Sequence, residues 1–274
     1  MSGMADTQPT GYFATDFATD AERQRLELLE AALDPNSIRR LTQLGVGADG
    51  RVRRCLEVGA GGGSIARWLA DRVAPKGTVV ATDVDTRFLE QLDRPNIEVR
   101  KHDISTDPLD PLAYDLVHCR LLLLHLADPA TALQKLADAV APGGVLLVEE
   151  WEYGTIQVAD PKHPLAEAVT KVNAALFELT LGIGIDIHLG RHLPDLVEAT
   201  GLKNVDHEGS LRITRGTPAA TMAKASTALL RPALVARHMV DDAEIEAWFA
   251  ALSDPSFRMI DYSTISVWGH RPPL

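Results

Sequence analysis

The sequence predicts an α/β protein in which a mostly parallel sheet carries helices on both faces. Apolar, strand-like runs alternate with helical patterns in the first half of the chain, and a glycine-rich turn follows the first run. These runs cover residues 54–58, 78–82, 97–101, 114–119 and 145–149. Repeated alternation requires crossover connections, which make neighbouring strands parallel. Ligands of such sheets bind outside the carboxyl ends of the strands, so we expect the chemistry there.

Residues 1–50 are expected to form an N-terminal helical lid. The first residues are small and polar, and leucines then recur at helical spacing from Leu26 to Leu33. The pair Asp34-Pro35 should end this helix, because proline has no amide hydrogen and clashes with the preceding turn. A second helix is expected over residues 38–44, with Gly45 as its C-terminal stop.

Residues 51–150 form the core in which strands and helices alternate. Helices are expected between the strands at residues 64–73, 86–92 and 129–140. The segment 103–113 is rich in Asp and Pro and is interpreted as a loop.

Residues 151–274 are expected to continue the same domain. Strands are expected at residues 205–214 and 259–268, and helices at residues 164–181, 193–200, 217–230 and 241–252. Two insertions, about 151–193 and 215–254, interrupt the pattern, and insertions on such sheets usually form a lid or a dimer face. We therefore expect a substrate lid, some of whose apolar side chains line a pocket, and a possible homodimer.

Composition narrows the partners of the chain. Of its 274 residues, 46% are hydrophobic and 24% are charged, which is typical of globular proteins. The net charge of −11 disfavours nucleic acid and anionic membranes as partners. Both cysteines lie in apolar runs, no run of about 18 apolar residues occurs, and the first residues lack a secretory pattern. We expect a cytoplasmic protein.

The segment from Cys55 to Ser64, CLEVGAGGGS, has the pattern of a strand, a tight turn and a helix start. Glycines let a backbone turn sharply and approach a ligand closely, and the following helix N-terminus favours anions. This pattern alone suits NAD, FAD or S-adenosylmethionine (SAM) equally.

Carboxylates end the next two strand-like runs and narrow the choice of cofactor. Asp83 lies about twenty residues after the glycines, where an acid can accept both ribose hydroxyls. Asp103 ends the third run and could accept a hydrogen bond from an adenine amino group, with Ile104 offering its backbone amide. The Pro142-Gly143-Gly144 turn leads into the fifth run.

Together these residues resemble the class I SAM-dependent methyltransferases, and in particular the small-molecule enzymes of the ubiquinone/menaquinone-biosynthesis-like group. The segment EVGAGGG from Glu57 is similar to their first motif, and Asp83, HDI from His102, YDLVHC from Tyr114 and APGG from Ala141 match the later ones. The resemblance is close over residues 53–150. It implies a Rossmann-like, seven-stranded sheet with an antiparallel last strand.

The resemblance also implies roles for individual residues. Glu57 would support the glycine turn, and Gly59, Ala60 and Gly61 would pass beneath the methionine part of SAM. Backbone atoms around His118–Arg120 would help to fix its carboxylate or amine; Arg120 could instead be a solvent-facing helix starter. Asp83 would hold the ribose, and Val84, Asp103 and Ile104 would contact the adenine. Tyr12 or Phe13 would fold over the cofactor as part of an N-terminal lid.

Methyl transfer from SAM is an in-line displacement that mainly requires alignment of the acceptor and exclusion of water. A general base helps where the acceptor loses a proton. The candidate catalytic residues are His125 and Glu150, ahead of His118, Glu149, Asp186, His188 and His192. Gly190 and Pro194 argue against a helix around His188 and His192, and thus against a zinc site.

The expected function is metal-independent methylation of a small organic metabolite, with an oxygen acceptor slightly favoured. No Asp- or Asn-Pro-Pro-Tyr follows the fourth run, which argues against the methyltransferases of DNA bases and protein amides. Two alternatives stay open: an NAD(P)-dependent oxidoreductase, and a non-catalytic regulator that binds SAM or a nucleotide.

Overall fold

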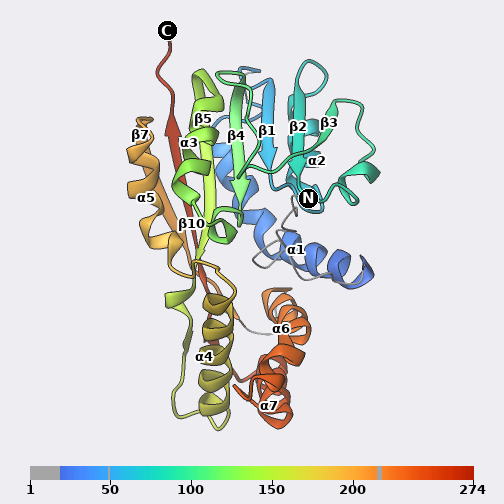
Figure 1. Cartoon of the computed structure of the whole chain (residues 1–274), viewed down its shortest axis with the longest axis vertical. Coiled ribbons are helices and arrows are strands. Elements are labelled where there is room, and N and C mark those ends of the chain that lie inside the picture. Colours follow the sequence, from blue (N-terminus) through green and yellow to red (C-terminus); the bar gives the residue numbers. More distant parts are fainter. Residues whose placement is uncertain (1–18, 49, 215–217) are drawn as a thin grey trace, which may run out of the picture.

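The computed structural model describes residues 19–48, 50–214 and 218–274, and its centre is a seven-stranded sheet (Figure 1). In spatial order the strands are β3 (Ile97–Lys101), β2 (Thr78–Asp83), β1 (Arg54–Val58), β4 (Tyr114–Arg120), β5 (Val140–Glu152), β10 (Ser263–His270) and β7 (Lys203–Ser210). The last strand, β10, runs antiparallel to β5 and β7, and the pairs from β3 to β5 are parallel. The predicted sheet is confirmed.

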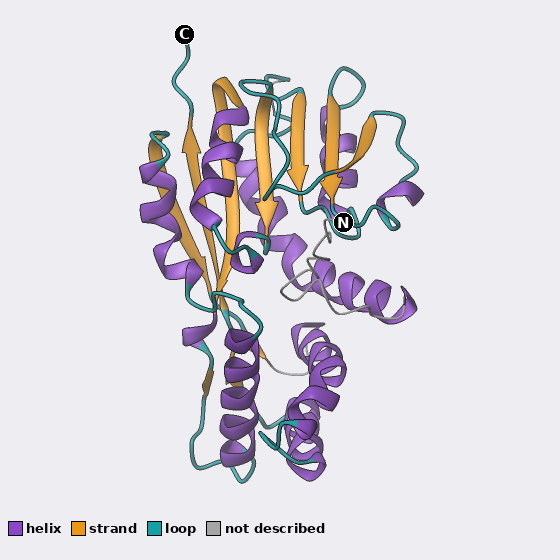
Figure 2. Cartoon of the chain, in the orientation of Figure 1, coloured by secondary structure: helices purple, strands orange, loops and turns teal. Residues whose placement is uncertain are grey.

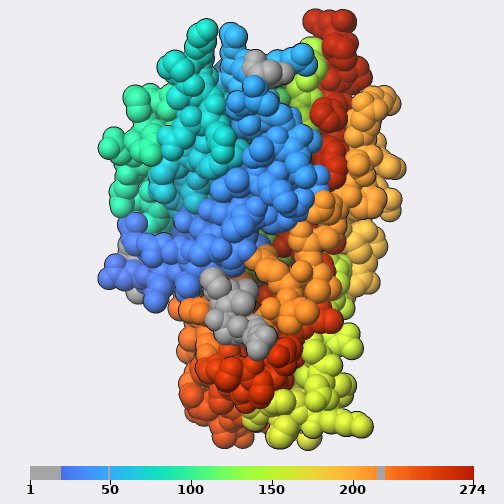
Figure 3. Space-filling view, turned by 180° about the vertical axis from the view of Figure 1, so that it is seen from behind, coloured from blue at the N-terminus to red at the C-terminus, as the bar shows by residue number. Residues whose placement is uncertain are grey.

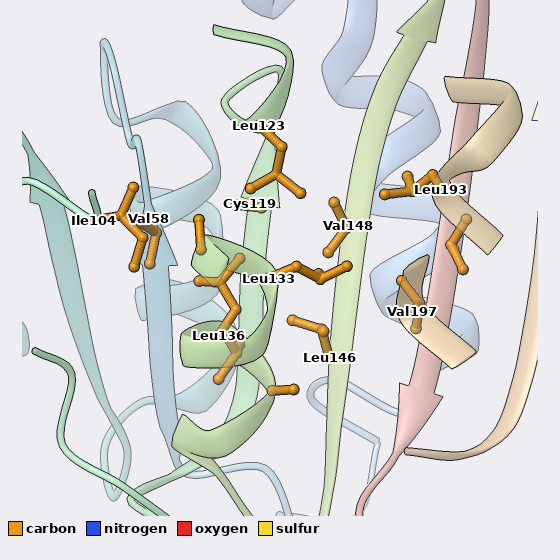
Figure 4. Close-up of a cluster of buried hydrophobic side chains, with 14 of the residues drawn as sticks. Val58, Ile104, Cys119, Leu123, Leu133, Leu136, Leu146, Val148, Leu193 and Val197 are labelled. Carbon is orange, nitrogen blue, oxygen red and sulfur yellow. The ribbon is translucent and has the colours of Figure 1, made fainter. Parts of the chain in front are cut away.

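Helices cover both faces of this sheet. Helix α2 (Ser64–Val73) and the C-terminal part of α1 (Thr19–Gln43) pack on one face. Helices α3 (Pro129–Ala139) and α5 (Leu189–Ala199) pack on the other, where Leu133 and Leu136 of α3 lie near Leu146 and Val148 of β5 (Figure 4). Burial of the apolar faces of these helices against the sheet is the main favourable contribution to folding, and it fixes the strand ends in place.

A second group of helices lies beyond the carboxyl ends of the parallel strands (Figure 2). This helical cluster consists of α4 (Ala166–Gly182), α6 (Pro218–Ala236) and α7 (Asp242–Ser253), and it has its own apolar core around Trp248. A small sheet of β6 (Gln157–Val158), β9 (Met259–Ile260) and β8 (Ile213–Thr214) connects it to β5 and β10. Helix α6 also contacts α1, which lies across the junction (Figure 3).

Helix α1 corrects the expectation that Asp34-Pro35 ends a helix, because it continues through Pro35 as one helix. Its two halves are held in line by tertiary contacts: Leu33 and Leu41 are buried, and Arg212 donates a hydrogen bond to the carbonyl of Ala32, close to the proline. Packing on both sides of a proline therefore outweighs the local preference to end the helix.

Other local predictions also need correction. The helix expected at residues 86–92 is only the 3₁₀ turn η2 (Leu89–Gln91), because the carboxylates of Asp83 and Asp85 bind the amides of Asp85 and Arg87 in local turns. The strands expected at residues 205–214 and 259–268 are each divided into two. Tyr12 and Phe13 lie outside the described residues.

Helix α5 begins at Leu189, so it includes Gly190 and Pro194, contrary to the expectation that they exclude a helix. Gly190 allows α5 to lie against the end of β5, since a Cβ there would stand 2.7 Å from the carbonyl oxygen of Trp151. The buried stripe of Leu189, Leu193 and Val197 compensates for the helix-breaking residues.

None of the helices in the described part of the chain combines the length and apolarity that crossing a bilayer requires.

Candidate active site

A pocket of about 750 Å³ opens at the carboxyl ends of β1, β2 and β4, where ligands of such sheets bind. Helix α1 covers one side, and α4, α6 and the junction between β5 and β10 form the rest. Its size is in the usual range for small-molecule sites. Nine of the ten predicted cofactor residues line it: Glu57, Gly59, Ala60, Gly61, Asp83, Val84, Asp103, Ile104 and Arg120.

The glycine turn after β1 is fixed to the end of β2 by backbone hydrogen bonds. The amides of Gly59 and Ala60 both donate to the carbonyl of Thr82, at 2.9 and 3.0 Å. The amide of Gly61 donates to Oδ2 of Asp83 at 2.8 Å. Gly59 and Gly61 have φ of 71° and 56°, a region that other residues rarely adopt, so this turn requires glycine.

The carboxylate of Asp83 holds this turn from the end of β2. Its Oδ1 accepts from the amide of Asp85 at 3.0 Å, and burial raises the pKa of its carboxyl above the ordinary value. Val84 follows with 39% of its surface exposed on the pocket wall. An ionisable acid beside an apolar surface suits the ribose and the base of an adenosyl group.

Asp103 and Ile104 lie on the wall at the end of β3. Oδ1 of Asp103 accepts from the amide of Ser105 at 2.9 Å, and its amide donates to Asp107. The carboxylate is thus held at the rim by its own loop, at the same sheet edge as Asp83.

His118 does not line the pocket, which corrects its placement among the cofactor contacts. Its imidazole is fully buried between two carboxylates, with Nδ1 donating to Glu57 at 2.7 Å and Nε2 donating to Glu149 at 3.3 Å. Burial alone would lower the pKa of His118, but the two carboxylates raise it to about 9. The residue is a buried cation that joins β1, β4 and β5.

Glu149 connects this buried cation to α1. Burial would raise the pKa of Glu149, but His118 lowers it to about 2. Its carboxylate also accepts from Ser266 at 2.6 Å and from Ser37 of α1. Glu149 is therefore a structural anion, and it does not reach the pocket as a base.

Arg120 lies at the end of β4 and lines the pocket. It donates to Asp34 and to Ser37 of α1, each at 2.9 Å, and its side chain is only 10% exposed. The interpretation of Arg120 as a solvent-facing helix starter is therefore wrong. Because it joins the strand end to α1, it holds the helical cover in place.

Glu150 is buried behind the pocket wall, so the structure does not bring it to a substrate. Its Oε1 accepts from the amides of Leu122 and Leu123, at 3.0 and 2.7 Å. Its Oε2 has no hydrogen-bond partner among the described residues, and burial raises its pKa to about 8. A protonated Glu150 thus fixes the turn after β4, including η3 (Leu123–His125), instead of acting as a base.

His125, at the end of η3, is the one catalytic candidate that lines the pocket. Burial, with a smaller effect of Arg25, lowers its pKa to about 4. Its imidazole is therefore neutral at physiological pH and has the protonation state that a base requires.

The candidates in the inserted segment lie away from this chemistry. His188 contacts Glu152 at 2.9 Å, and Arg191 pairs with the same carboxylate. Asp186 and His192 are absent from the wall of the pocket. Across the described residues, no group of three or more His, Cys, Asp or Glu side chains is placed to hold a metal ion.

A methyltransferase domain model matches residues 22–207. The chain belongs to the methyltransferase domain family. The predicted resemblance to class I SAM-dependent methyltransferases is confirmed.

Two curated relatives of this chain carry more specific names. Methyltransferase str2 of Strobilurus tenacellus is 29% identical over 152 residues, which cover 55% of this chain and 54% of the relative. The ubiquinone biosynthesis O-methyltransferase of Paracidovorax citrulli is 37% identical over 101 residues, which cover 34% of this chain and 41% of the relative. The chain spans about half the length of the curated relatives it matches.

Solved structures show the same fold. Phosphoethanolamine N-methyltransferase 2 of Haemonchus contortus, in complex with phosphomonomethylethanolamine and S-adenosylhomocysteine, gives a TM-score of 0.60 at 14% identity, covering 93% of this chain and 58% of that one. The YcgJ protein of Bacillus subtilis gives a TM-score of 0.51 at 15% identity, and the match covers 83% of this chain and 97% of that one. At these identities the likeness concerns the fold alone.

Several residues of the pocket could not be identified from the sequence. Tyr262 lines it from the bend between β9 and β10, which the sequence had suggested was one continuous strand. Glu30 of α1 lies against the glycine turn, where a Cβ at Gly62 would overlap its carboxylate. Leu26 and Leu29 also line the pocket; their helical stripe was visible, but the direction it faces depends on tertiary packing.

Proposed function

We propose that the protein transfers a methyl group from SAM to a small organic molecule. The observation that carries this proposal is the glycine turn, fixed by its amides to Thr82 and Asp83 at the edge of a large pocket. The pocket continues past this turn into an apolar region, which provides room for an acceptor beside the cofactor.

The residues present fit SAM. The backbone of Gly59–Gly61 would lie under its methionine part, and Asp83 would accept hydrogen bonds from its ribose. Val84 would pack on the adenine, and Asp103 and Ile104 would meet the edge of that base. These assignments are supported by the position of all of these residues on one pocket wall.

When bound, SAM supplies a methyl group on a sulfonium sulfur, which keeps the bonding electron pair as the acceptor atom forms its bond to carbon. The protein therefore has to align the acceptor and exclude water. We propose that α1, together with the segments 151–193 and 215–254, acts as the lid for this purpose. The contact between α1 and α6 supports such a closure.

His125 is the proposed general base, and an oxygen acceptor is favoured. A neutral imidazole on the wall can accept the proton that a hydroxyl group loses during methylation. The reaction is proposed to be metal-independent, because a sulfonium leaves without help from a Lewis acid. Replacing His125 by Asn should lower the rate of S-adenosylhomocysteine formation about 100-fold with little change in cofactor affinity.

Calorimetric titration with SAM, S-adenosylhomocysteine and NAD tests the cofactor. We expect both adenosyl ligands to bind and NAD not to bind, and Asp83→Asn to weaken binding at least about tenfold. Asp71→Asn is the matched control, because Asp71 is exposed and pairs with Arg94. Binding of NAD without SAM would instead identify an oxidoreductase, and binding of SAM without turnover of any acceptor would favour a regulator.

The setting of the protein is proposed from its charge and composition. We propose a cytoplasmic enzyme that has no nucleic-acid or membrane partner and that forms a homodimer. Sedimentation of the purified protein tests the dimer.

A further inference from the structure

Four aromatic side chains meet at the junction between the main sheet and the helical cluster, and all four line the pocket. Trp151 lies near the end of β5, Tyr153 in η4 (Tyr153–Thr155), Phe177 in α4, and Tyr262 between β9 and β10. They come from four separate elements, so the fold brings them together. We call this group the aromatic wall.

The rings of the aromatic wall pack directly on one another. Tyr262 lies 4.6 Å from Tyr153 and 4.9 Å from Trp151 between centroids, with tilts of 36° and 41°. Tyr153 meets Phe177 and Trp151 edge-on, at 5.8 Å and 78° in both cases. These are ordinary contact distances for aromatic pairs, so the rings fill the space between themselves.

This arrangement favours a flat ligand over a cation. An ammonium group is bound by rings that stand apart around it, whereas rings in mutual contact leave no such space between them. Aromatic side chains on a pocket wall can bind an aromatic ring by stacking or edge contact.

Carboxylates adjoining the wall along the chain are already engaged by the protein. Glu150 accepts from two loop amides, and Glu152 pairs with His188 and Arg191. Asp261, next to Tyr262, is buried and accepts from the amide of Tyr262 at 2.9 Å. A cationic acceptor that sought its counter-charge beside the aromatic wall would have to compete with these contacts.

The rest of this region is mainly apolar. Met222 of α6 and Ile183 and Ile185 after α4 line it, and Thr180, Ser226 and Thr227 provide hydroxyl groups. Such a site matches a ligand with an uncharged ring system and few polar groups.

We propose that the aromatic wall binds the ring of the acceptor, and that the acceptor is an uncharged aromatic alcohol. This inference rests on the proposed function, and it names the substrate class of the same pocket. Phe177 is the specificity-determining residue that is easiest to test, because its ring is in contact with only one other ring of the wall.

Binding of matched probes to the protein saturated with S-adenosylhomocysteine tests the proposal by calorimetry. The probes are 2-naphthol and its saturated counterpart decahydro-2-naphthol, which share a carbon skeleton and a hydroxyl group. We expect 2-naphthol to bind roughly tenfold more tightly. Phe177→Leu should weaken naphthol binding roughly fivefold and leave the saturated alcohol unchanged.

Phe249→Leu is the matched control, since Phe249 packs against Trp248 in the helical cluster and is not part of the pocket wall. Equal binding of the two alcohols, or binding of neither, overturns the proposal. So does tighter binding of choline than of its neutral isostere 3,3-dimethyl-1-butanol. Binding of S-adenosylhomocysteine is measured first, and a failure to bind would count against the proposed cofactor. In that case the two alcohols are compared on the protein without S-adenosylhomocysteine, which tests the aromatic wall separately.

Discussion

The buried charge of His118 determines how the stability of this protein should depend on pH. The pKa of its imidazole rises from 6.5 to about 9 in the folded protein, because the carboxylates of Glu57 and Glu149 outweigh the effect of burial. At about 1.4 kcal/mol per pH unit, this rise corresponds to about 3 kcal/mol of folding free energy. The contribution is complete below pH 6.5 and is lost as the pH rises through about 9, since the unfolded chain releases its proton first.

Urea unfolding followed by circular dichroism, between about pH 6 and about pH 9.5, measures this loss. Glu150 also lowers the free energy of unfolding as the pH rises, because burial raises its pKa from 4.5 to about 8. The comparison with His118→Gln therefore cancels the contribution of Glu150, which both proteins share. The variant should be less stable at pH 6 and should lose about 3 kcal/mol less over the range.

His207→Gln is the control, because His207 is an exposed histidine outside this network. It should retain the full pH dependence of the wild type. If the wild type and His118→Gln lost equal free energy between these pH values, the imidazole would not be held charged, and the account of the buried network would be refuted.

Three further results are expected. Arg120→Ala should lower the free energy of unfolding by about 2 kcal/mol, because Asp34 loses a partly buried charged partner, and limited proteolysis should cut α1 sooner; unchanged cleavage would show that α1 is held by other contacts. Trp248→Ala should lower the free energy of unfolding by about 3–5 kcal/mol, measured by urea unfolding. The substitution empties the core of the helical cluster and leaves Asn173 without its indole donor. A loss below about 1 kcal/mol would contradict that packing. Treatment with EDTA should leave the rate of S-adenosylhomocysteine formation unchanged, and a loss restored by one added metal would refute the proposed metal independence.

Much of the sheet could be predicted because its signals are local. Each of the first strands is a short apolar run bounded by polar or turn residues, and parallel strands buried on both faces have this pattern. The glycine turn and Asp83 could be placed for the same reason, since their position follows from where a strand ends. Nine of the ten predicted cofactor residues accordingly line the pocket.

What could not be predicted depends on contacts between distant segments. Nothing near Pro35 indicates that the helix continues, because the contacts that maintain it come from the core and from Arg212. His118 and Glu150 appeared chemically active, since polar residues at strand ends usually face a cleft. Their side chains are instead buried in the protein. His118 contacts Glu57 and Glu149, and Glu150 accepts from the amides of two loop residues. These contacts depend on how β4 pairs with β5.

The two halves of the pocket are built in different ways, and this difference explains how an acceptor site could change while the cofactor site is kept. Backbone amides and carbonyls form most of the glycine turn, so substitutions in the acceptor half leave it intact. Side chains such as Phe177 and Met222 form the acceptor half, so a single substitution there should alter acceptor KM without altering cofactor affinity. Helix α1 contacts both halves: Glu30 accepts from the amide of Ser64 beside the glycine turn, and the helix also packs against α6. A variant that loosens α1 should therefore weaken cofactor and acceptor together, and this joint effect separates a positioning role from a specificity role.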